Sequence, residues 1–259
     1  GDLSVRVAHT VGDRQDDIAQ LARDFDTMTE RIGHLLRTQQ RLMRDVSHEL
    51  RSPLARLQAL QSVARQRFTS EDQTHILDRM DAESERLNEL IERILAFARL
   101  DAQQNIRRQF TDVADLVRTI IDDVHVELAG EDILVHQSGP ERLTLEADAA
   151  LLHSAIENIV RNAVRFTPEG SIVEVTLTES PIGIRVIIDD EGPGVPEDAL
   201  GKLFDPFFQV DASRSHGNGG SGVGLAIARR AVHLHGGSIR AKNRAEGGLR
   251  VTVELPRAA

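Results

Sequence analysis

Residues Arg44–Leu60 read RDVSHELRSPLARLQAL, a helical pattern that also contains a histidine, an acid and a proline. Its leucines recur at intervals of three and four residues, which is the spacing of one apolar helix face. His48 stands beside Glu49, and Pro53 follows after little more than one helical turn. A surface histidine next to a kink is the plain structural interpretation, so the rest of the chain must decide whether these residues carry chemistry.

The same helical pattern extends on both sides of this stretch, from about Asp16 to Leu100. Polar residues interrupt it at Gln66–Asp72, where Ser70 is a candidate N-cap for a second helix with acids in its first turn. Two long amphipathic helices joined by a short loop form an antiparallel hairpin. The apolar positions of the two helices are Ile18, Leu21, Phe25, Met28, Ile32, Leu42, Met43, Val46, Leu50, Leu54 and Leu57, then Ile76, Met80, Leu87, Ile91, Ile94 and Ala98.

A single hairpin cannot cover two apolar stripes of this length. Each buried Leu or Ile contributes roughly 1.5–3 kcal/mol, so a whole stripe left in water is implausible. Pairing two hairpins into a four-helix bundle buries both stripes, and we therefore predict a homodimer. The alternative, that the stripes pack on the C-terminal part of the same chain, stays open.

Beyond a polar linker at about Asp101–Arg108, the pattern changes to alternating helices and strands. Strands and helices mixed in this way predict an α/β sandwich with helices on one face of a mixed sheet. The helices are expected at Val113–Leu128, Ala149–Val164 and Leu225–His235, and the strands at Ile133–His136, Arg142–Glu146, Ile172–Leu177, Ile184–Ile188, Ser238–Asn243 and Leu249–Leu255.

The composition excludes several classes of function. A formal net charge of −10 argues against non-specific nucleic-acid binding, and the absence of Trp and Tyr argues against an aromatic platform for single strands. Without cysteine there is neither a disulfide frame nor a thiolate zinc site, and the ten histidines show no HExxH spacing. No run approaches about 20 apolar residues, so we expect no membrane span in this chain. It opens without an initiator Met, and we expect it to be a fragment.

Two segments of the C-terminal part suggest a nucleotide site. In ENIVRNAVRFTP, Asn158 and Asn162 lie four residues apart and share a helix face, where amide oxygens suit Mg²⁺ and Arg165 would reach phosphates. In DDEGPGVP, Asp190 ends an apolar strand, and the following glycines permit a turn or a close approach to a ligand. Solvated asparagines and a strand-ending turn are the structural alternatives.

Two further segments follow. LFDPFF, Leu203–Phe208, gathers three phenylalanines beside a polar stretch, and this cluster either pins the edge of a flexible lid or belongs to an ordinary core. GGSGVGLAIARRAV opens a helix with Gly220, Gly222 and Gly224, a pattern suited to holding an anion at the helix N-terminus. No Lys-Ser/Thr follows and no strand precedes it, so neither a P-loop nor a Rossmann motif is indicated.

These four segments, in this order, resemble the N, G1, F and G2 boxes of the ATP-binding domain of sensor histidine kinases. The resemblance implies the Bergerat fold, an α/β sandwich shared with gyrase, Hsp90 and MutL. SHELRSPL resembles the H box around the phosphoaccepting histidine, and HELRSPLARLQ is similar to envelope-stress sensors of the CpxA type. DDIAQLARDFDTMTERI is similar to the last helix of a HAMP signal-relay module. The implied parts are a partial HAMP module at 1–36, a dimerisation and histidine-phosphotransfer (HisKA) domain at 37–100 and an ATP-binding domain at 107–259.

The resemblance implies a protein-histidine kinase that uses ATP and Mg²⁺. His48 would attack the γ-phosphorus, Glu49 would act as general base, and the phosphoryl group would pass to an aspartate of a response regulator. Ser52 corresponds to a position associated with removing that phosphate from the regulator; otherwise Ser52 only caps or solvates its helix. The implied nucleotide-site residues are Asn158 and Asn162 for Mg²⁺, Arg165 and Arg214 for phosphates, Asp190 for the adenine amino group, and Gly192, Gly194, Phe204, Gly220, Ser221, Gly222, Val223, Gly224 and Leu225 around them.

Two rival functions remain. An ATP hydrolase of the gyrase and Hsp90 kind carries a Glu four residues before its magnesium-binding Asn, and here that position is Asn158, which cannot act as a base. A non-catalytic dimeric relay would not need the intact acceptor and nucleotide motifs. We therefore expect a homodimeric kinase that acts on a response regulator, binds no nucleic acid, and is the cytoplasmic part of a protein anchored in the bacterial inner membrane.

Overall fold

The computed structural model describes residues 17–64, 70–102, 106–128, 130, 132–210 and 222–257. The chain forms two compact units, Gly1–Ser84 and Glu85–Ala259. No helix in these described ranges carries an apolar stretch long enough to cross a bilayer.

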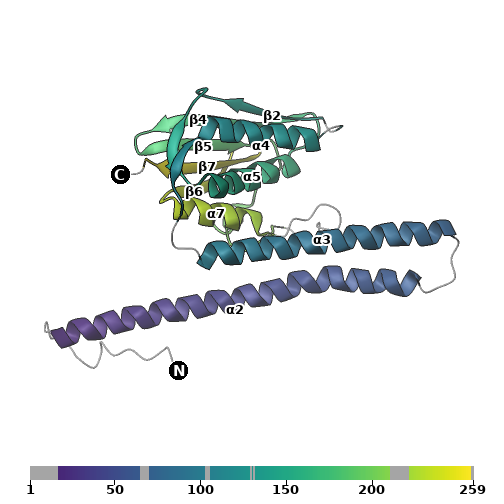
Figure 1. Cartoon of the computed structure of the whole chain (residues 1–259), viewed down its shortest axis with the longest axis horizontal. Coiled ribbons are helices and arrows are strands. Elements are labelled where there is room, and N and C mark those ends of the chain that lie inside the picture. Colours follow the sequence, from purple (N-terminus) through teal and green to yellow (C-terminus); the bar gives the residue numbers. More distant parts are fainter. Residues whose placement is uncertain are drawn as a thin grey trace. The chain divides into compact units, whose positions relative to one another are not determined.

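The first helix, α2 (Asp17–Ala64), is uninterrupted over 48 residues (Figure 1). It continues through Pro53, whose ring removes one backbone donor and whose side chain is buried. It also continues through residues 36 and 37, the boundary that the family resemblance suggests. The segment similar to a HAMP helix and the segment with His48 therefore belong to one helix.

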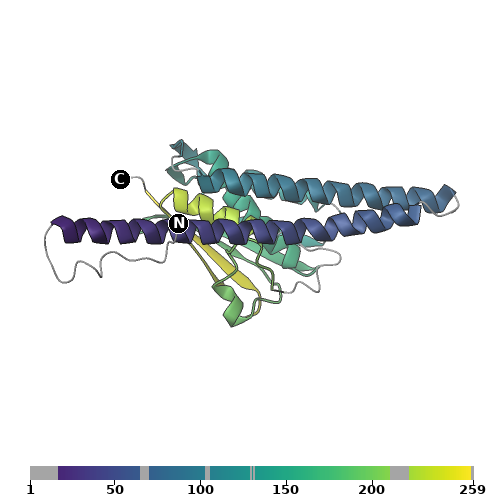
Figure 2. The ribbon, with the colours of Figure 1, turned by 90° about the horizontal axis from the view of Figure 1, so that it is seen from below.

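The second helix, α3 (Ser70–Ala102), begins at Ser70, so Ser70 is its first helical residue and not the N-cap before it. The last turns of α2 lie beside the first turns of α3, as the hairpin prediction requires (Figure 2). Five described apolar side chains on the two helices are half or more exposed: Leu21, Phe25, Met28, Leu54 and Leu77. The hairpin thus leaves several of its described apolar side chains exposed, which is the condition that led us to predict a dimer.

The C-terminal unit is built on a five-stranded mixed sheet in the order β2-β4-β5-β7-β6. Only β2 and β4 run parallel, and the other neighbours are antiparallel. A separate antiparallel pair joins β1 and β3. The strands are β1 (Gln109–Asp112), β2 (Ile133–Ser138), β3 (Thr144–Ala147), β4 (Ser171–Ser180), β5 (Gly183–Asp189), β6 (Ser238–Asn243) and β7 (Leu249–Pro256).

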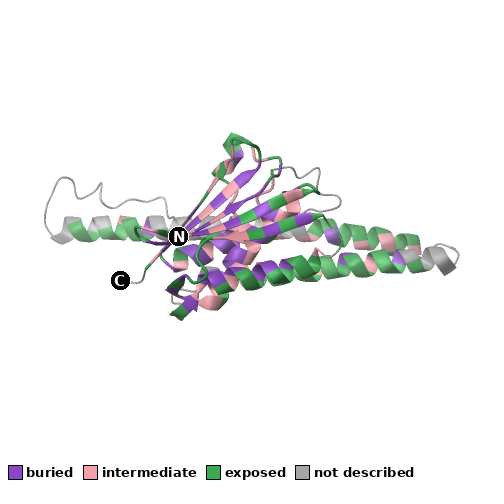
Figure 3. Cartoon of the chain, turned by 90° about the horizontal axis from the view of Figure 1, so that it is seen from above, coloured by how far each residue is buried: buried purple, intermediate pink, exposed green. Residues whose placement is uncertain are grey.

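Three helices cover one face of this sheet: α4 (Val113–Glu127), α5 (Ala149–Phe166) and α7 (Gly224–Leu234) (Figure 1). Burial alternates strictly along β7, so one side of the strand faces the helices and the other faces solvent (Figure 3). The helices bury their apolar faces in one shared core with the inner side of the sheet. The predicted α/β sandwich with helices on one face is confirmed. The sequence patterns gave no sign of β1 or of the single-turn helix α6 (Glu197–Leu200).

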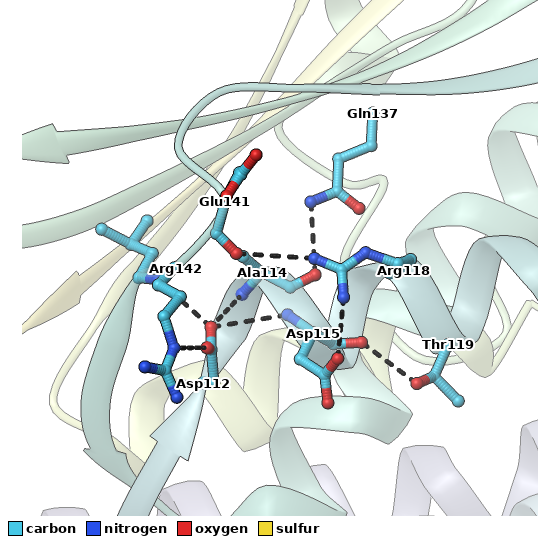
Figure 4. Close-up of polar contacts among 9 residues, drawn as sticks. Asp112, Ala114, Asp115, Arg118, Thr119, Gln137, Glu141 and Arg142 are labelled. Carbon is cyan, nitrogen blue, oxygen red and sulfur yellow. Dashed lines mark hydrogen bonds and ion pairs between the residues drawn. The ribbon is translucent and has the colours of Figure 1, made fainter.

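A polar cluster fixes the start of α4 (Figure 4). The side chain of Asp112 caps the helix by accepting hydrogen bonds from the backbone N–H groups of Ala114 and Asp115, and it also accepts one from Leu143. Burial opposes the ionisation of Asp112, but these hydrogen bonds and nearby Arg142 outweigh it and lower the pKa of the carboxyl. The capped carboxylate therefore joins α4 to the β2–β3 connection at one point.

Candidate functional site

The helix α5 positions the two asparagines of the N segment. Its N-terminus is capped by Asp148, whose side chain accepts a hydrogen bond from Leu151 N at 3.3 Å. The apolar residues of α5 point into the core, which leaves Asn158 and Asn162 half-buried on a flank of the helix.

The amide of Asn158 has a defined orientation. Its Nδ2 donates to the carbonyl oxygen of Ser154 at 2.7 Å, so its oxygen points the other way. A Cβ placed on Gly224 would lie only 2.7 Å from Asn158 Oδ1. A side chain at position 224 would therefore separate the start of α7 from α5. The structure brings together these two predicted site residues, which are 66 positions apart in sequence.

The side chain of Asn162 makes no hydrogen bond with any residue that the structure describes. A half-buried amide without a partner is available to a ligand. Amide oxygens are neutral, hard donors that suit Mg²⁺. The described residues include no group of three or more His, Asp or Glu side chains placed to hold a metal. The asparagine pair therefore fits an ion that takes most of its compensating charge from nucleotide phosphates.

Asp190 follows directly after β5 and is only 5% exposed. Its Oδ1 accepts hydrogen bonds from Gly192 N at 2.9 Å and from Leu249 N at 3.0 Å, while Oδ2 has no partner among the described residues. Burial raises the pKa of Asp190, and the two backbone hydrogen bonds and the charge of Arg244 only partly offset this. A fixed carboxylate with one open oxygen is suited to accepting a hydrogen bond from a ligand.

The turn between β6 and β7 holds Asp190 in place, and sequence reasoning missed it. Arg244 Nη1 donates to the backbone oxygen of Asp190 at 2.6 Å. Gly248, at φ +88°, lies so close that a Cβ there would be 1.9 Å from the same oxygen. The one signal that the sequence offers for this turn is the glycine pair Gly247–Gly248 directly before the last strand.

The two glycines of the G1 segment permit close backbone packing. A Cβ on Gly192 would lie 2.7 Å from the carbonyl oxygen of Phe166, at the end of α5. Gly194 has φ +70°, and a Cβ there would lie 2.9 Å from Asn243 Oδ1. Asn243 in turn bonds both backbone groups of Val195, at 2.9 and 2.7 Å. These contacts hold the loop after Asp190 against α5 and β6.

The segment between the F and G2 motifs has its two ends joined. Phe207 N donates to the carbonyl oxygen of Gly222 at 2.9 Å, and Phe207 itself has φ +62°. For a residue with a side chain this left-handed conformation costs roughly 1–2 kcal/mol. Arg229 of α7 also pairs with Asp205 at 3.3 Å. The predicted residues Arg214, Gly220 and Ser221 lie outside the described residues.

Three predicted site residues serve in packing. Phe204 is 8% exposed and belongs to the main core, as does the partly buried Leu225. Val223 is fully buried in a second apolar cluster with Leu100 and Ile227. The described contacts of these three side chains are with apolar residues next to the site, and no described contact places any of the three toward a ligand.

Arg165 lies at the end of α5, half-buried, with its guanidinium 5.4 Å from the centre of the Phe166 ring. Burial lowers the pKa of Arg165, and the neighbouring charge of Arg93 lowers it further. No carboxylate among the described residues pairs with it. It also borders a cavity of about 530 Å³ lined by Val124, Glu127, Leu128, Ile133, Arg161, Val164, Arg165, Thr167 and Glu169. A partly desolvated cation without a counter-ion is suited to an anionic ligand.

The helix with the predicted acceptor His48 is α2. His48 and Glu49 are helical, but their side chains lie outside the described residues. One turn further, the exposed hydroxyl of Ser52 accepts a hydrogen bond from Arg56 Nη1 at 2.7 Å. Arg56 also donates to Glu83 of α3 at 2.9 and 2.7 Å.

Two family models match this chain. The model described as histidine kinase-, DNA gyrase B- and HSP90-like ATPase matches residues 147–259, and the His Kinase A (phospho-acceptor) domain matches residues 38–103.

Curated relatives include the sensor histidine kinase CpxA of Escherichia coli K12, which is 34% identical over 235 residues, covering 90% of this chain and 50% of CpxA. BaeS of the same strain, a signal transduction histidine-protein kinase, is 30% identical over 99% of this chain and 54% of BaeS. The sensor protein CutS of Streptomyces coelicolor is 34% identical over 98% of this chain and 61% of CutS. The chain thus spans about half to three fifths of the length of these curated relatives.

Solved structures of histidine kinases are also similar to this chain. The histidine kinase ThkA in complex with the response regulator protein TrrA has a TM-score of 0.71 at 22% identity, covering 94% of this chain and 68% of that one, which shows the shared fold. Full-length ShkA in complex with AMPPNP has a TM-score of 0.60 at 28% identity, covering 85% and 46%. The nucleotide-free catalytic domain of ThkA has a TM-score of 0.52 at 27% identity and is covered over 97% of its length.

Proposed function

The chain belongs to the sensor histidine kinases of two-component systems, and from this we propose that it transfers the γ-phosphoryl group of ATP to His48 and then to an aspartate of a response regulator. One observation favours transfer over hydrolysis. The position where a related hydrolase needs a water-activating Glu is Asn158, whose amide is bonded to Ser154 and whose oxygen faces Gly224. An amide in this place cannot remove a proton from water.

In the proposed first step, an imidazole nitrogen of His48 forms a bond to the γ-phosphorus. The bond between that phosphorus and the β–γ bridging oxygen breaks, and ADP leaves with the electron pair. Glu49 takes the proton that the imidazole loses. Asp190 would hold the adenine by accepting a hydrogen bond from its amino group, and Arg165 would bind a phosphate. These groups orient the reactants, which is the main contribution of a protein to phosphoryl transfer.

Asn158 and Asn162 are the residues that would hold Mg²⁺. When bound there, the ion would neutralise charge on the phosphates.

The test is incubation with ATP labelled on the γ-phosphate. Label on the protein that is lost in acid and retained in base identifies phosphohistidine. His48→Gln should abolish this label while ATP still binds, whereas His136→Gln, which changes an exposed histidine on the open face of the sheet, should leave it intact. Free phosphate without protein label would establish a hydrolase. If neither labelled protein nor free phosphate forms, the chain is a relay without catalysis.

We further propose that the chain acts as a homodimer in which two hairpins form a four-helix bundle. The exposed apolar side chains of α2 and α3 support this proposal. Light scattering after size exclusion should give twice the mass of the 28.6 kDa chain. A monomer at micromolar concentration would contradict it.

The remaining parts of the proposal rest on family membership. The relatives are named sensors, so we propose that this chain is the cytoplasmic part of a protein anchored in the bacterial inner membrane, with a partial HAMP module before its acceptor domain. Ser52 gives the chain a second activity in this proposal, the removal of phosphate from the regulator. In a mixture with phosphorylated regulator, Ser52→Ala should slow that removal and leave autophosphorylation intact.

A further inference from the structure

The hydroxyl of Ser52 is not an isolated surface group. Arg56, one turn further along α2, donates from Nη1 to Ser52 Oγ at 2.7 Å. The same guanidinium donates from Nε at 2.9 Å and from Nη2 at 2.7 Å to Oε1 of Glu83 on α3. A continuous hydrogen-bonded path therefore runs from the second helix of the hairpin to Ser52.

The anchor of this path is buried. The side chain of Glu83 is 6% exposed, whereas that of Arg56 is 52% exposed. A carboxylate removed from water needs hydrogen-bonding and cationic partners, and the two hydrogen bonds from Arg56 to Glu83 hold the guanidinium beside it. A guanidinium is planar and rigid, and holding it by Nε and Nη2 also fixes the direction in which Nη1 points. Lysine has a single nitrogen and cannot reproduce this arrangement.

The contact also decides what the Ser52 hydroxyl can do. A serine hydroxyl has two lone pairs and one O–H. Arg56 occupies one lone pair and can accept nothing in return, so the O–H must donate elsewhere. The adjacent positive charge also strengthens that O–H as a donor.

We propose that Arg56, anchored by Glu83, is a positioning residue for dephosphorylation of the response regulator: it turns the Ser52 O–H outward, where it donates to the water that attacks the aspartyl phosphate. The water oxygen forms a bond to phosphorus. The bond between phosphorus and the carboxyl oxygen breaks, its electron pair returns to the regulator's carboxylate, and the proton lost by the water leaves with inorganic phosphate. The proposal rests on the phosphatase role of Ser52 given above.

The experiment is a double-mutant cycle on the full chain. The probe is a response-regulator receiver domain that takes label from the phosphorylated wild-type chain, and its dephosphorylation is followed with ADP present. Arg56→Lys should lower the maximal rate about tenfold, the effect of one charge-assisted hydrogen bond, and leave half-saturation by the receiver unchanged. Autophosphorylation should stay within about twofold. Arg118→Lys is the matched control, because Arg118 forms an exposed ion pair with Asp115 in the other unit.

The cycle separates positioning from simple helix support. In the Ser52→Ala background, Arg56→Lys should cause no further loss, because the group that it positions is absent. An equal loss in both backgrounds would overturn the proposal, and so would an unchanged rate for Arg56→Lys. If Ser52→Ala alone has no effect, the phosphatase role itself fails, and the proposal with it. Should Arg56→Lys lose helix content, Glu83→Gln gives the same test, with the same outcomes deciding.

Discussion

Gly248→Ala should weaken ATP binding by moving Asp190, and the structure gives the size of the displacement. A Cβ on Gly248 would lie 1.9 Å from the backbone oxygen of Asp190, whereas ordinary contact begins at about 3.4 Å. One of the two must move by about 3.4 − 1.9 = 1.5 Å. The hydrogen bond from Leu249 N, the next residue, to Asp190 Oδ1 at 3.0 Å cannot survive a shift of that size. If Asp190 is the proposed acceptor for adenine, losing its fixed position should cost roughly 1–3 kcal/mol, or about one to two decades in the Kd for ATP.

The matched control is the neighbouring glycine. Gly247 has φ +99°, similar to the +88° of Gly248, but a Cβ on Gly247 meets nothing within 4 Å. Gly247→Ala therefore has a similar backbone strain, roughly 1–2 kcal/mol, without the collision. Titration of each variant with ATP by calorimetry, together with urea unfolding, separates the two effects. Equal Kd values for the two variants would refute the displacement of Asp190. The shared backbone strain should lower the free energy of unfolding of both variants.

Three further outcomes are expected. Glu49→Gln should lower autophosphorylation by roughly 10²–10⁴-fold with unchanged ATP affinity if Glu49 is the general base, and an unaltered rate would contradict that role. GTP should bind about one to two decades more weakly than ATP, because guanine presents a carbonyl oxygen where Asp190 offers only acceptors; comparable calorimetric Kd values would refute this, and Asp190→Asn should weaken ATP binding without unfolding. Burial lowers the pKa of His235, whose Nε2 accepts a hydrogen bond from Asp148 N. The contribution of neutral His235 to the free energy of unfolding should therefore be complete above about pH 6.5 and be lost as the pH falls below that value. Between pH 8 and pH 5.5, urea unfolding should show a smaller decrease in stability for His235→Gln than for the wild type, and equal decreases would exclude His235 as the cause.

Periodicity predicted the large elements of this fold because apolar spacing alone determines which face of a long helix or strand can be buried. The same reasoning missed β1, which is four residues long and has two exposed positions, so it carries too few side chains to show a pattern.

The site was only partly predictable, for a different reason. Asn158, Asn162 and Asp190 can be identified from the sequence because they are polar residues at motif positions. Gly248 and Arg244 instead contact the backbone oxygen of Asp190 from a turn that is distant in sequence. That proximity arises from the pairing of β5 with β7, where Asp189 lies opposite Arg250, and short-range sequence patterns do not record it. Phe204 shows the converse, since a phenylalanine in a motif carries the same letter whether it lines a ligand or fills the core.

Because α2 is unbroken, the number of residues between two of its positions determines the angle between them around the helix axis. Each residue advances an α-helix by about 100°, so inserting one residue between Ile32 and His48 would turn the acceptor to a different side of the helix relative to everything before Ile32. Inserting seven residues would add about 700°, nearly two full turns, and would return His48 to within about 20° of its original azimuth. A signal that arrives as axial rotation or tilt would therefore reach His48 without a flexible joint to absorb it, and the phase of the helix, more than its length, would determine whether the acceptor faces its nucleotide.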